Sequence, residues 1–115
     1  MSQEHASIAR VRATAHTVPT DATRCAGISE FLHIGALAAA WHVPLSAHTA
    51  PSLHLHPCCA LAGVAHIEYF HDHVRIEQLF FDGAATAVNG ELRADPARPG
   101  LGLELREDVA ARYAV

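Results

Sequence analysis

Three short apolar runs, separated by two stretches of helical periodicity, occupy residues 18–70, and this alternation limits the fold more than any other feature of the chain. In the first helical stretch, apolar residues recur at the three- and four-residue spacing of an amphipathic helix. Strands that alternate with helices in this order are typical of a parallel α/β sheet. The expected strands lie at residues 18–20, 43–47 and 65–70, and the expected helices at residues 27–41 and from a cap at Thr49 or Ser52 to about residue 63.

The pattern changes after Asp72. The dipeptide Asn89-Gly90 lies between short runs of strand-forming residues and predicts a β-hairpin with a tight turn. Residues 96–102 are rich in proline and glycine and predict a loop, whereas residues 107–113 predict a short C-terminal helix.

Composition limits the classes of protein to which the chain can belong. Hydrophobic residues make up 50% of the 115, which is enough for the core of one domain. All eight basic residues are arginine, so a lysine base and Schiff-base chemistry are excluded, and the net charge of −4 does not favour nucleic-acid binding. The three cysteines suggest reduced thiols, and no apolar stretch approaches the ~20 residues of a membrane span. We therefore expect a soluble, cytoplasmic protein without a nucleic-acid or membrane partner.

Asp21, His48 and Glu68 each lie at or near the carboxyl end of one of the three expected strands. Because the carboxyl ends of parallel strands meet at one edge of a sheet, these side chains could face one site. A carboxylate beside an imidazole holds one ring N–H and leaves the other ring nitrogen to accept a proton, and a partly buried second carboxyl group can donate one. We interpret the three as candidate catalytic residues, although ten histidines and twelve acidic residues also make such a triple attainable by chance.

Two His-x-His pairs invite a metal-binding interpretation, since imidazole is a common metal ligand. His54 and His56 lie in an expected helix, where residues two apart do not share a face, so we interpret them as ordinary helix residues. His71 and His73 follow an expected strand, but further ligands at zinc-site spacing are missing.

Four strings in order resemble the C-terminal part of the barrel domain of enolase-superfamily enzymes, in particular the mandelate racemase and muconate lactonizing enzyme group. They are residues 21–28 (Asp-Ala-Thr-Arg-Cys-Ala-Gly-Ile), 44–48 (Pro-Leu-Ser-Ala-His), 66–70 (His-Ile-Glu-Tyr-Phe) and 99–104 (Pro-Gly-Leu-Gly-Leu-Glu). In that family an Asp and a His that end two successive strands form the base dyad, and a Glu on the last strand often acts as the acid. The resemblance therefore implies these roles for Asp21, His48 and Glu68. Where the family usually has a second glycine, this chain has Ala26.

The resemblance also implies a fold that this chain does not complete, because an eight-unit barrel takes about 250 residues. We expect an α/β fold that is the C-terminal portion of a TIM-type barrel: about two βα units and the last strand, then a β-hairpin and a short helix. Residues 18–115 would form this incomplete barrel, and residues 1–17 an atypical, poorly ordered segment. A partner chain or a second copy would cover the open strand edges.

Intact enzymes of the family bind Mg²⁺ through acidic residues of earlier strands, so the resemblance implies Mg²⁺ for the intact enzyme, with its ligands absent here. The resulting hypothesis is a fragment of an acid-sugar dehydratase (a lyase) or racemase (an isomerase). It would remove the proton next to the carboxylate of a small carboxylate or sugar acid, and it would be inactive alone. Two alternatives remain: an interaction subunit that completes a barrel with another polypeptide, and a histidine-based metal-binding module.

Overall fold

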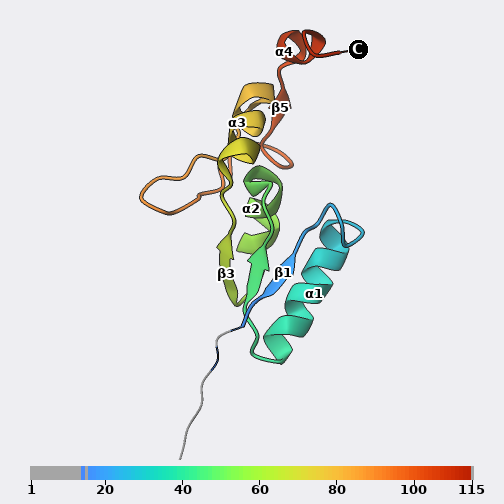
Figure 1. Ribbon diagram of the computed structural model, residues 1–115, viewed down its shortest axis with the longest axis vertical. Helices are drawn as coiled ribbons and strands as arrows, with labels where there is room; N and C mark the ends of the chain where they lie inside the picture. The colour runs from blue at the N-terminus through green and yellow to red at the C-terminus, as the bar shows by residue number, and fades with distance from the viewer. Residues whose placement is uncertain (1–13, 15, 115) are drawn as a thin grey trace, which may run out of the picture.

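A three-stranded parallel sheet with two connecting helices forms the first part of the molecule. The computed structural model describes residue 14 and residues 16–114, so the interpretation of residues 1–17 falls mostly outside the described residues and stays a prediction. The strand order is β1-β2-β3, and both pairings are parallel. The prediction of a parallel α/β fold is confirmed. The elements are β1 (Val18–Thr20), α1 (Ile28–Ala40), β2 (Leu45–Ala47), α2 (Pro51–Cys59) and β3 (Val64–Ile67), which we call the sheet region together with their connections, residues 18–70 (Figure 1).

The register of the sheet brings the carboxyl ends of the three strands to one edge. Ala47 lies opposite Thr20 on one side and opposite Ile67 on the other. The backbone ladder continues past the strands, because the N–H of His48 donates to the carbonyl of Thr20 and the N–H of Glu68 donates to the carbonyl of Ala47. The residues that follow the strands are thereby fixed relative to one another.

The core lies between the sheet and the two helices. α1 contacts β1 and β2, α2 contacts β3, and the helices contact each other. Phe31 of α1 is completely buried, as is nearly all of Leu45 in β2, because the apolar faces of helix and strand pack together. The buried cluster consists of Ala22, Phe31, Leu45, Ala47 and Cys58.

The start of α2 differs from the expected one. Neither Thr49 nor Ser52 caps the helix; the cap is Ala50, and Pro51 occupies the first turn, where a missing N–H costs nothing. The Ser52 hydroxyl instead donates to Glu77 Oε2 at 2.6 Å, a contact with a residue that is distant in the chain.

The remaining residues, 71–114, form a second part that we call the C-terminal region, and here the prediction was partly wrong. An unpredicted helix, α3 (His71–Phe80), follows the sheet region and leads directly into β4 (Phe81–Asp82). β4 pairs antiparallel with β5 (Glu104–Leu105), whereas the expected hairpin at Asn89-Gly90 is reduced to a single bridge between Val88 and Glu91. The predicted C-terminal helix is present as α4 (Glu107–Ala111). α3, β5 and α4 stand beyond the end of the sheet (Figure 1).

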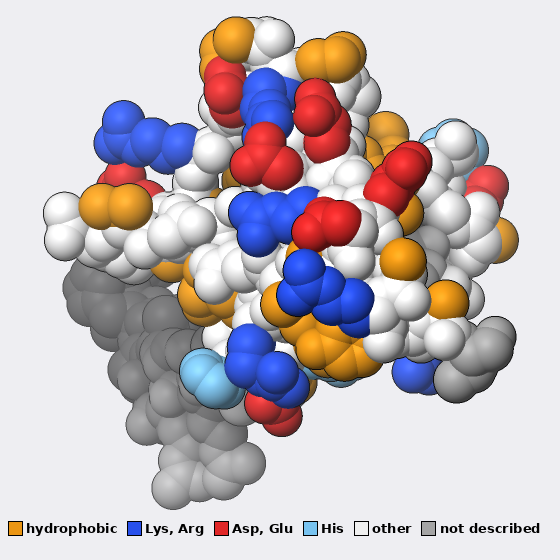
Figure 2. Space-filling model, turned by 90° about the horizontal axis from the view of Figure 1, so that it is seen from above, with side chains coloured by type: hydrophobic (Ala, Val, Ile, Leu, Met, Phe, Trp, Pro, Cys, Tyr) orange, Lys and Arg blue, Asp and Glu red, His pale blue; other side chains and the backbone are white. Residues whose placement is uncertain are grey.

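Charged side chains hold much of the C-terminal region together. Arg98 Nη2 lies 2.6 Å from Asp82 Oδ2 and 4.0 Å from Glu104 Oε1, so it joins both strands of the small sheet. Figure 2, which views the molecule from the end occupied by α4, shows arginine and acidic side chains interleaved around smaller apolar patches. None of the helices in the described part of the chain combines the length and apolar character needed to cross a lipid bilayer.

Candidate active site

Asp21, His48 and Glu68 lie together at the carboxyl edge of the parallel sheet. His48 Nδ1 lies 3.2 Å from Asp21 Oδ2, and His48 Nε2 lies 4.0 Å from Glu68 Oε2. The imidazole therefore stands between the two carboxyl groups, with one ring nitrogen directed to each. Asp21 and His48 also border an open hollow of about 640 Å³ along the outer edge of β1, so small molecules can reach the pair.

The Asp21 carboxylate is held in place by the turn that follows β1. Its Oδ1 accepts hydrogen bonds of 2.8 Å from both the N–H and the hydroxyl of Thr23, and its side chain is only 11% exposed. Burial raises the pKa of the Asp21 carboxyl group, but the hydrogen bonds from Thr23 and from His48 outweigh that effect, so the pKa lies below its ordinary value. Asp21 is therefore an oriented anion at neutral pH.

The His48 ring is suited to proton transfer. Because an ionised carboxylate can only accept a hydrogen bond, the contact with Asp21 places the proton on Nδ1 and leaves the Nε2 lone pair free. The ring is 43% exposed and meets the edge of Phe70, with ring centroids 6.1 Å apart. A histidine held in this tautomer by a carboxylate can act as a general base at Nε2.

Glu68 presents an unusual carboxyl group. Its Oε2 is buried and has no hydrogen-bond partner among the described residues, although the side chain as a whole is 28% exposed. A buried carboxyl oxygen without a partner costs free energy in the folded state, and such groups concentrate at functional sites. A substrate atom placed between Glu68 and His48 would satisfy it.

The turns that carry Asp21 and His48 are strained. Ala26 has a φ of 71° before Gly27 at 103°, and Thr49 and Ala50 have φ values of 47° and 39°. Residues other than glycine rarely adopt this left-handed conformation, and consecutive ones persist only where neighbouring contacts enforce them. Both turns directly follow a candidate catalytic residue.

The sequence profile of the enolase C-terminal domain-like family matches residues 3–109. The chain belongs to this family. Among curated proteins, no sequence match was found.

Solved structures of enolase-family proteins share the fold of this chain. A mandelate racemase/muconate lactonizing enzyme-like protein from Rubrobacter xylanophilus is 47% identical, with a TM-score of 0.80 over 84% of this chain and 27% of the other. An L-talarate dehydratase from Polaromonas sp. JS666, complexed with Mg and L-glucarate, is 34% identical, with a TM-score of 0.68 over 82% and 25%. A racemase from Streptomyces coelicolor A3(2) with bound magnesium is 25% identical, with a TM-score of 0.72 over 84% and 25%. This chain thus spans about a quarter of the length of the enolase-family structures that it matches.

The described residues do not fit a metal ion. Among them, no group of three or more histidine, cysteine or acidic side chains is arranged to hold one. His71 lies 3.5 Å from Asp72 at the start of α3, but both side chains are more than four-fifths exposed and no further ligand joins them. Mg²⁺ is bound in two of the enolase-family structures above, and the described part of this chain offers no set of ligands for it.

Sequence reasoning missed one residue beside the site. His54, interpreted as an ordinary helix residue, is completely buried, and both ring nitrogens are hydrogen-bonded to backbone groups. His56, two residues further along α2, is only partly buried. The signal that could have identified His54 is its place between Leu53 and Leu55 in a helix expected to pack on the sheet.

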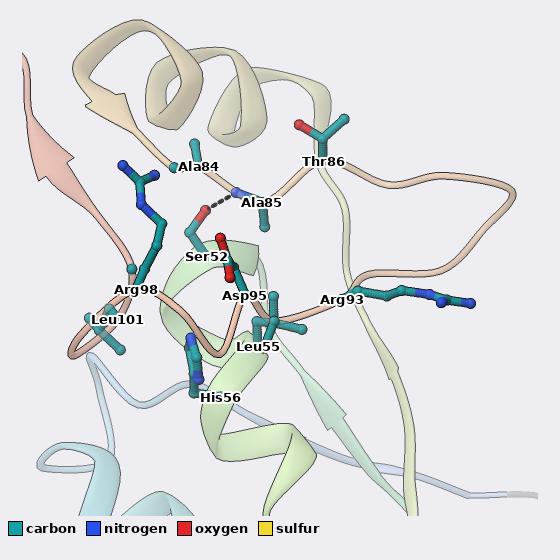
Figure 3. Close-up of a pocket in the computed structure, with 13 residues that line it drawn as sticks. Ser52, Leu55, His56, Ala84, Ala85, Thr86, Arg93, Asp95, Arg98 and Leu101 are labelled. Atoms are coloured by element: carbon teal, nitrogen blue, oxygen red, sulfur yellow. Dashed lines mark hydrogen bonds between the residues drawn. The ribbon is translucent and has the colours of Figure 1, made fainter.

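A second hollow, of about 100 Å³, lies away from these residues between α2 and the loop of residues 83–102 (Figure 3). Two of its polar side chains already have partners: the Ser52 hydroxyl accepts from the N–H of Ala85 at 2.8 Å and donates to Glu77, and Arg98 binds Asp82. The hollow lies where the C-terminal region meets α2, and it offers little room for a ligand.

Proposed function

We propose that the chain supplies the proton-transfer groups of an enolase-superfamily enzyme that acts on a small carboxylate, with sugar acids as the substrate class. His48 removes or returns the proton next to the carboxylate, Asp21 orients His48 and stabilises its charged form, and Glu68 acts as the acid. The observation that carries this proposal is the position of the His48 ring between Asp21 and Glu68, 3.2 Å from one and 4.0 Å from the other.

The chemistry follows from the two sides of the ring. When Nε2 accepts the substrate proton, the imidazole gains a positive charge, and the Asp21 carboxylate at Nδ1 stabilises it. The Glu68 carboxyl group lies on the other side, where it can protonate a leaving hydroxyl group or hydrogen-bond to the negative oxygen that develops. Proton removal by His48 and loss of the protonated hydroxyl group as water give a dehydration. A racemisation needs a proton from a second acid on the opposite face of the carbon, which the remainder of the barrel would supply.

The substrate class comes from the structural relatives. One of them is an L-talarate dehydratase complexed with L-glucarate, and another is an L-talarate/galactarate dehydratase from Salmonella typhimurium LT2, 31% identical to this chain. No step of the proposal passes through a metal, because the described residues do not assemble a metal site. We propose that the chain alone shows no turnover and is active only with the remainder of a barrel.

Complementation tests this function. The full chain would be co-expressed with the part of the Rubrobacter xylanophilus protein that lies outside the aligned segment, and the complex incubated in D₂O with Mg²⁺ and a panel of sugar acids. We expect exchange or loss of the proton next to the carboxylate, followed by NMR. His48→Asn should reduce the rate by about 10²–10⁴-fold, the range of general acid–base catalysis.

The matched control is His33→Asn, which changes an exposed histidine of α1 whose Nδ1 lies 3.4 Å from Glu30 Oε1. Its rate should equal that of the unaltered chain. An active complex that tolerates His48→Asn would refute the proposed role of His48, and turnover by the chain alone would refute its dependence on further strands.

A second candidate function, an interaction subunit that completes a barrel with another polypeptide, is favoured by one surface. Trp41 and Leu37 are 76% and 63% exposed. With Ile34 and Val43 they border an apolar hollow of about 270 Å³ beside Val18, the first residue of the edge strand β1. Large exposed apolar side chains grouped in this way are typical of a surface covered by another polypeptide.

The single tryptophan makes this candidate easy to test. Adding the purified complement should shift the Trp41 fluorescence to shorter wavelength, because the ring would pass from water into an apolar contact. Trp41→Phe would serve as the blank. Gel filtration showing two separate, folded components and an unchanged spectrum would count against an interaction subunit.

A further inference from the structure

His54 connects the backbone segments that carry Asp21 and His48. Its Nε2 accepts a hydrogen bond of 2.9 Å from the N–H of Ala22, and its Nδ1 lies 2.8 Å from the carbonyl oxygen of Thr49. A backbone N–H can only donate and a backbone carbonyl can only accept, so the ring must carry its proton on Nδ1. The tautomer of His54 is therefore fixed by its two partners.

The two hydrogen-bond partners of His54 are next to the candidate catalytic residues in the sequence. Ala22 directly follows Asp21, and Thr49 directly follows His48. One imidazole ring thus spans the distance between the two candidate catalytic residues through the neighbouring peptide groups. Its Nε2 also lies 3.7 Å from Asp21 Oδ1, beside the carboxylate that orients His48.

The ring has little freedom to move. His54 is completely buried and stacks at a tilt on Phe31, itself completely buried, with ring centroids 5.2 Å apart. Thr49 and Ala50 both adopt left-handed backbone conformations, which need contacts that enforce them. The hydrogen bond from His54 to the Thr49 carbonyl is one such contact.

We propose that His54 is a positioning residue, which holds Asp21 and His48 at the separation needed for proton transfer by bonding to the residue after each. Its catalytic consequence rests on the proposed function, but the positioning itself can be measured without turnover. A misplacement of about 1 Å at reacting groups can lower a rate by up to about 10²-fold, so such a residue matters without touching the substrate.

The first test uses the unaltered full chain with ¹⁵N-labelled histidine. Nitrogen chemical shifts distinguish the two neutral tautomers, and we expect His54 to carry its proton on Nδ1 and His48 to carry its proton on Nδ1 toward Asp21. The Ala22 amide should be protected from hydrogen exchange. A His54 proton on Nε2, or an unprotected Ala22 amide, would overturn the proposal, and this result does not depend on whether any variant folds.

Two variants separate the two bonds. His54→Asn keeps a donor near the Nδ1 position for the Thr49 carbonyl but cannot reach Ala22, whereas His54→Gln places an acceptor near the Nε2 position for Ala22 but loses Thr49. We expect Ala22 amide exchange to accelerate by about tenfold or more in His54→Asn and to change less in His54→Gln. In both variants the His48 spectrum should lose its preference for the Nδ1 proton.

Two controls on the same helix isolate positioning from stability. His56→Gln changes a partly buried histidine that borders the second hollow, and Leu55→Ala removes a buried side chain and destabilises the fold. Neither should alter the His48 tautomer. If Leu55→Ala altered it as much as the His54 variants do, His54 would have only a structural role.

The kcat and KM of the His54 variants would be measured in the complemented complex described above. Both His54 variants should lower kcat while leaving KM nearly unchanged, because the substrate contacts remain. Unchanged kcat in both variants would overturn the proposal. If no complex turns over, the proposed function fails, whereas the spectra still decide whether His54 positions the pair.

Discussion

The sheet region and the C-terminal region are stabilised by different forces. Every buried hydrophobic side chain of the described residues except Val74 lies in the sheet region, around Phe31 and Leu45. The C-terminal region is stabilised instead by ion pairs around Arg98 and by contacts of half-exposed side chains. The candidate catalytic residues all belong to the sheet region, so the part of the molecule with the densest packing also fixes the separation of Asp21 and His48.

Because their packing differs, the two regions need not unfold together. Local stability follows buried apolar contacts, and a region with few of them opens at lower cost. The connection between the regions is narrow: Glu77 of α3 accepts from Ser52 of α2, and Ser52 accepts from the N–H of Ala85. The chain therefore combines a rigid site with a more weakly held extension.

The greatest loss of stability should result from a substitution in the core of the sheet region. Phe31→Ala should lower the free energy of unfolding by about 3–5 kcal/mol, because it leaves a cavity beneath the buried ring of His54. Phe80→Ala, in the C-terminal region, removes an edge contact with the exposed Tyr113 and should cost roughly 1 kcal/mol. Urea denaturation followed by circular dichroism measures both, and equal losses would contradict the comparison.

The reactivity of the Cys58 thiol shows whether the sheet region has opened during the same experiments. Cys58 is buried, and burial raises its pKa to about 11, whereas Cys59 is exposed. At mildly alkaline pH, an alkylating agent should therefore modify Cys59 first and reach Cys58 only when the sheet region opens.

A further prediction concerns the stability of the C-terminal region alone. Gly83 has a φ of 82°, and a Cβ atom there would collide with Arg98 and with the backbone carbonyl of Gly102. Gly83→Ala should destabilise this region by about 1–3 kcal/mol, since strain adds to the clash. Gly90→Ala is the matched control, because Gly90 has a similar φ of 79° but open space around it. Cys58 should stay protected in both variants, and its rapid alkylation in Gly83→Ala would show that the regions unfold as one.

A smaller effect on the free energy of unfolding is expected from a substitution in the turn after Asp21. Ala26 adopts a φ of 71°, which an alanine tolerates poorly and a glycine readily. Ala26→Gly should raise the free energy of unfolding by roughly 0.5–1 kcal/mol, with part of the relief offset by the greater freedom of glycine in the unfolded chain. Thermal unfolding measures the change, with Ala36→Gly on the exposed face of α1 as the control that should destabilise. Destabilisation by both would mean that Ala26 is not strained.

The smallest expected effect is the dependence of the stability of the small sheet on pH and salt concentration. The hydrogen bond and charge of Arg98 lower the pKa of Asp82, so the pair stabilises the fold above the unfolded pKa of the carboxyl group and loses that contribution as the pH falls below about 4. Asp82→Asn should flatten the pH dependence of amide exchange in the small sheet. Salt should weaken the contribution of Asp82, because the pair is exposed. It should affect Asp21 less, because Asp21 is largely buried and accepts its shortest hydrogen bonds from neutral Thr23 groups, whereas the exposed Arg24 lies 3.7 Å away. An equal response to salt at both carboxylates would contradict the comparison.

Most of the sheet region could be predicted from the sequence, whereas much of the C-terminal region could not. Strand-forming runs and helical spacing are local signals, and they placed β1, α1 and β2 within a few residues. α3 gives a weak local signal, since no side chain caps it at Phe70 and only Val74 is buried. The Asn89-Gly90 turn formed, but the flanking residues pair through a single bridge rather than as a hairpin.

The strand-helix order, and the placement of Asp21, His48 and Glu68 at or near the ends of three strands, could be derived from the sequence alone because both depend on short-range patterns. The structure adds that β3 ends at Ile67, directly before Glu68. Parallel pairing then brings all three to one edge of the sheet. The burial of His54 and its hydrogen bond with Ala22, 32 residues earlier, arise from tertiary packing, as does the contact between Glu77 and Ser52 across 25 residues. Such contacts depend on how the elements pack in three dimensions, so the periodicity of a single segment cannot predict them.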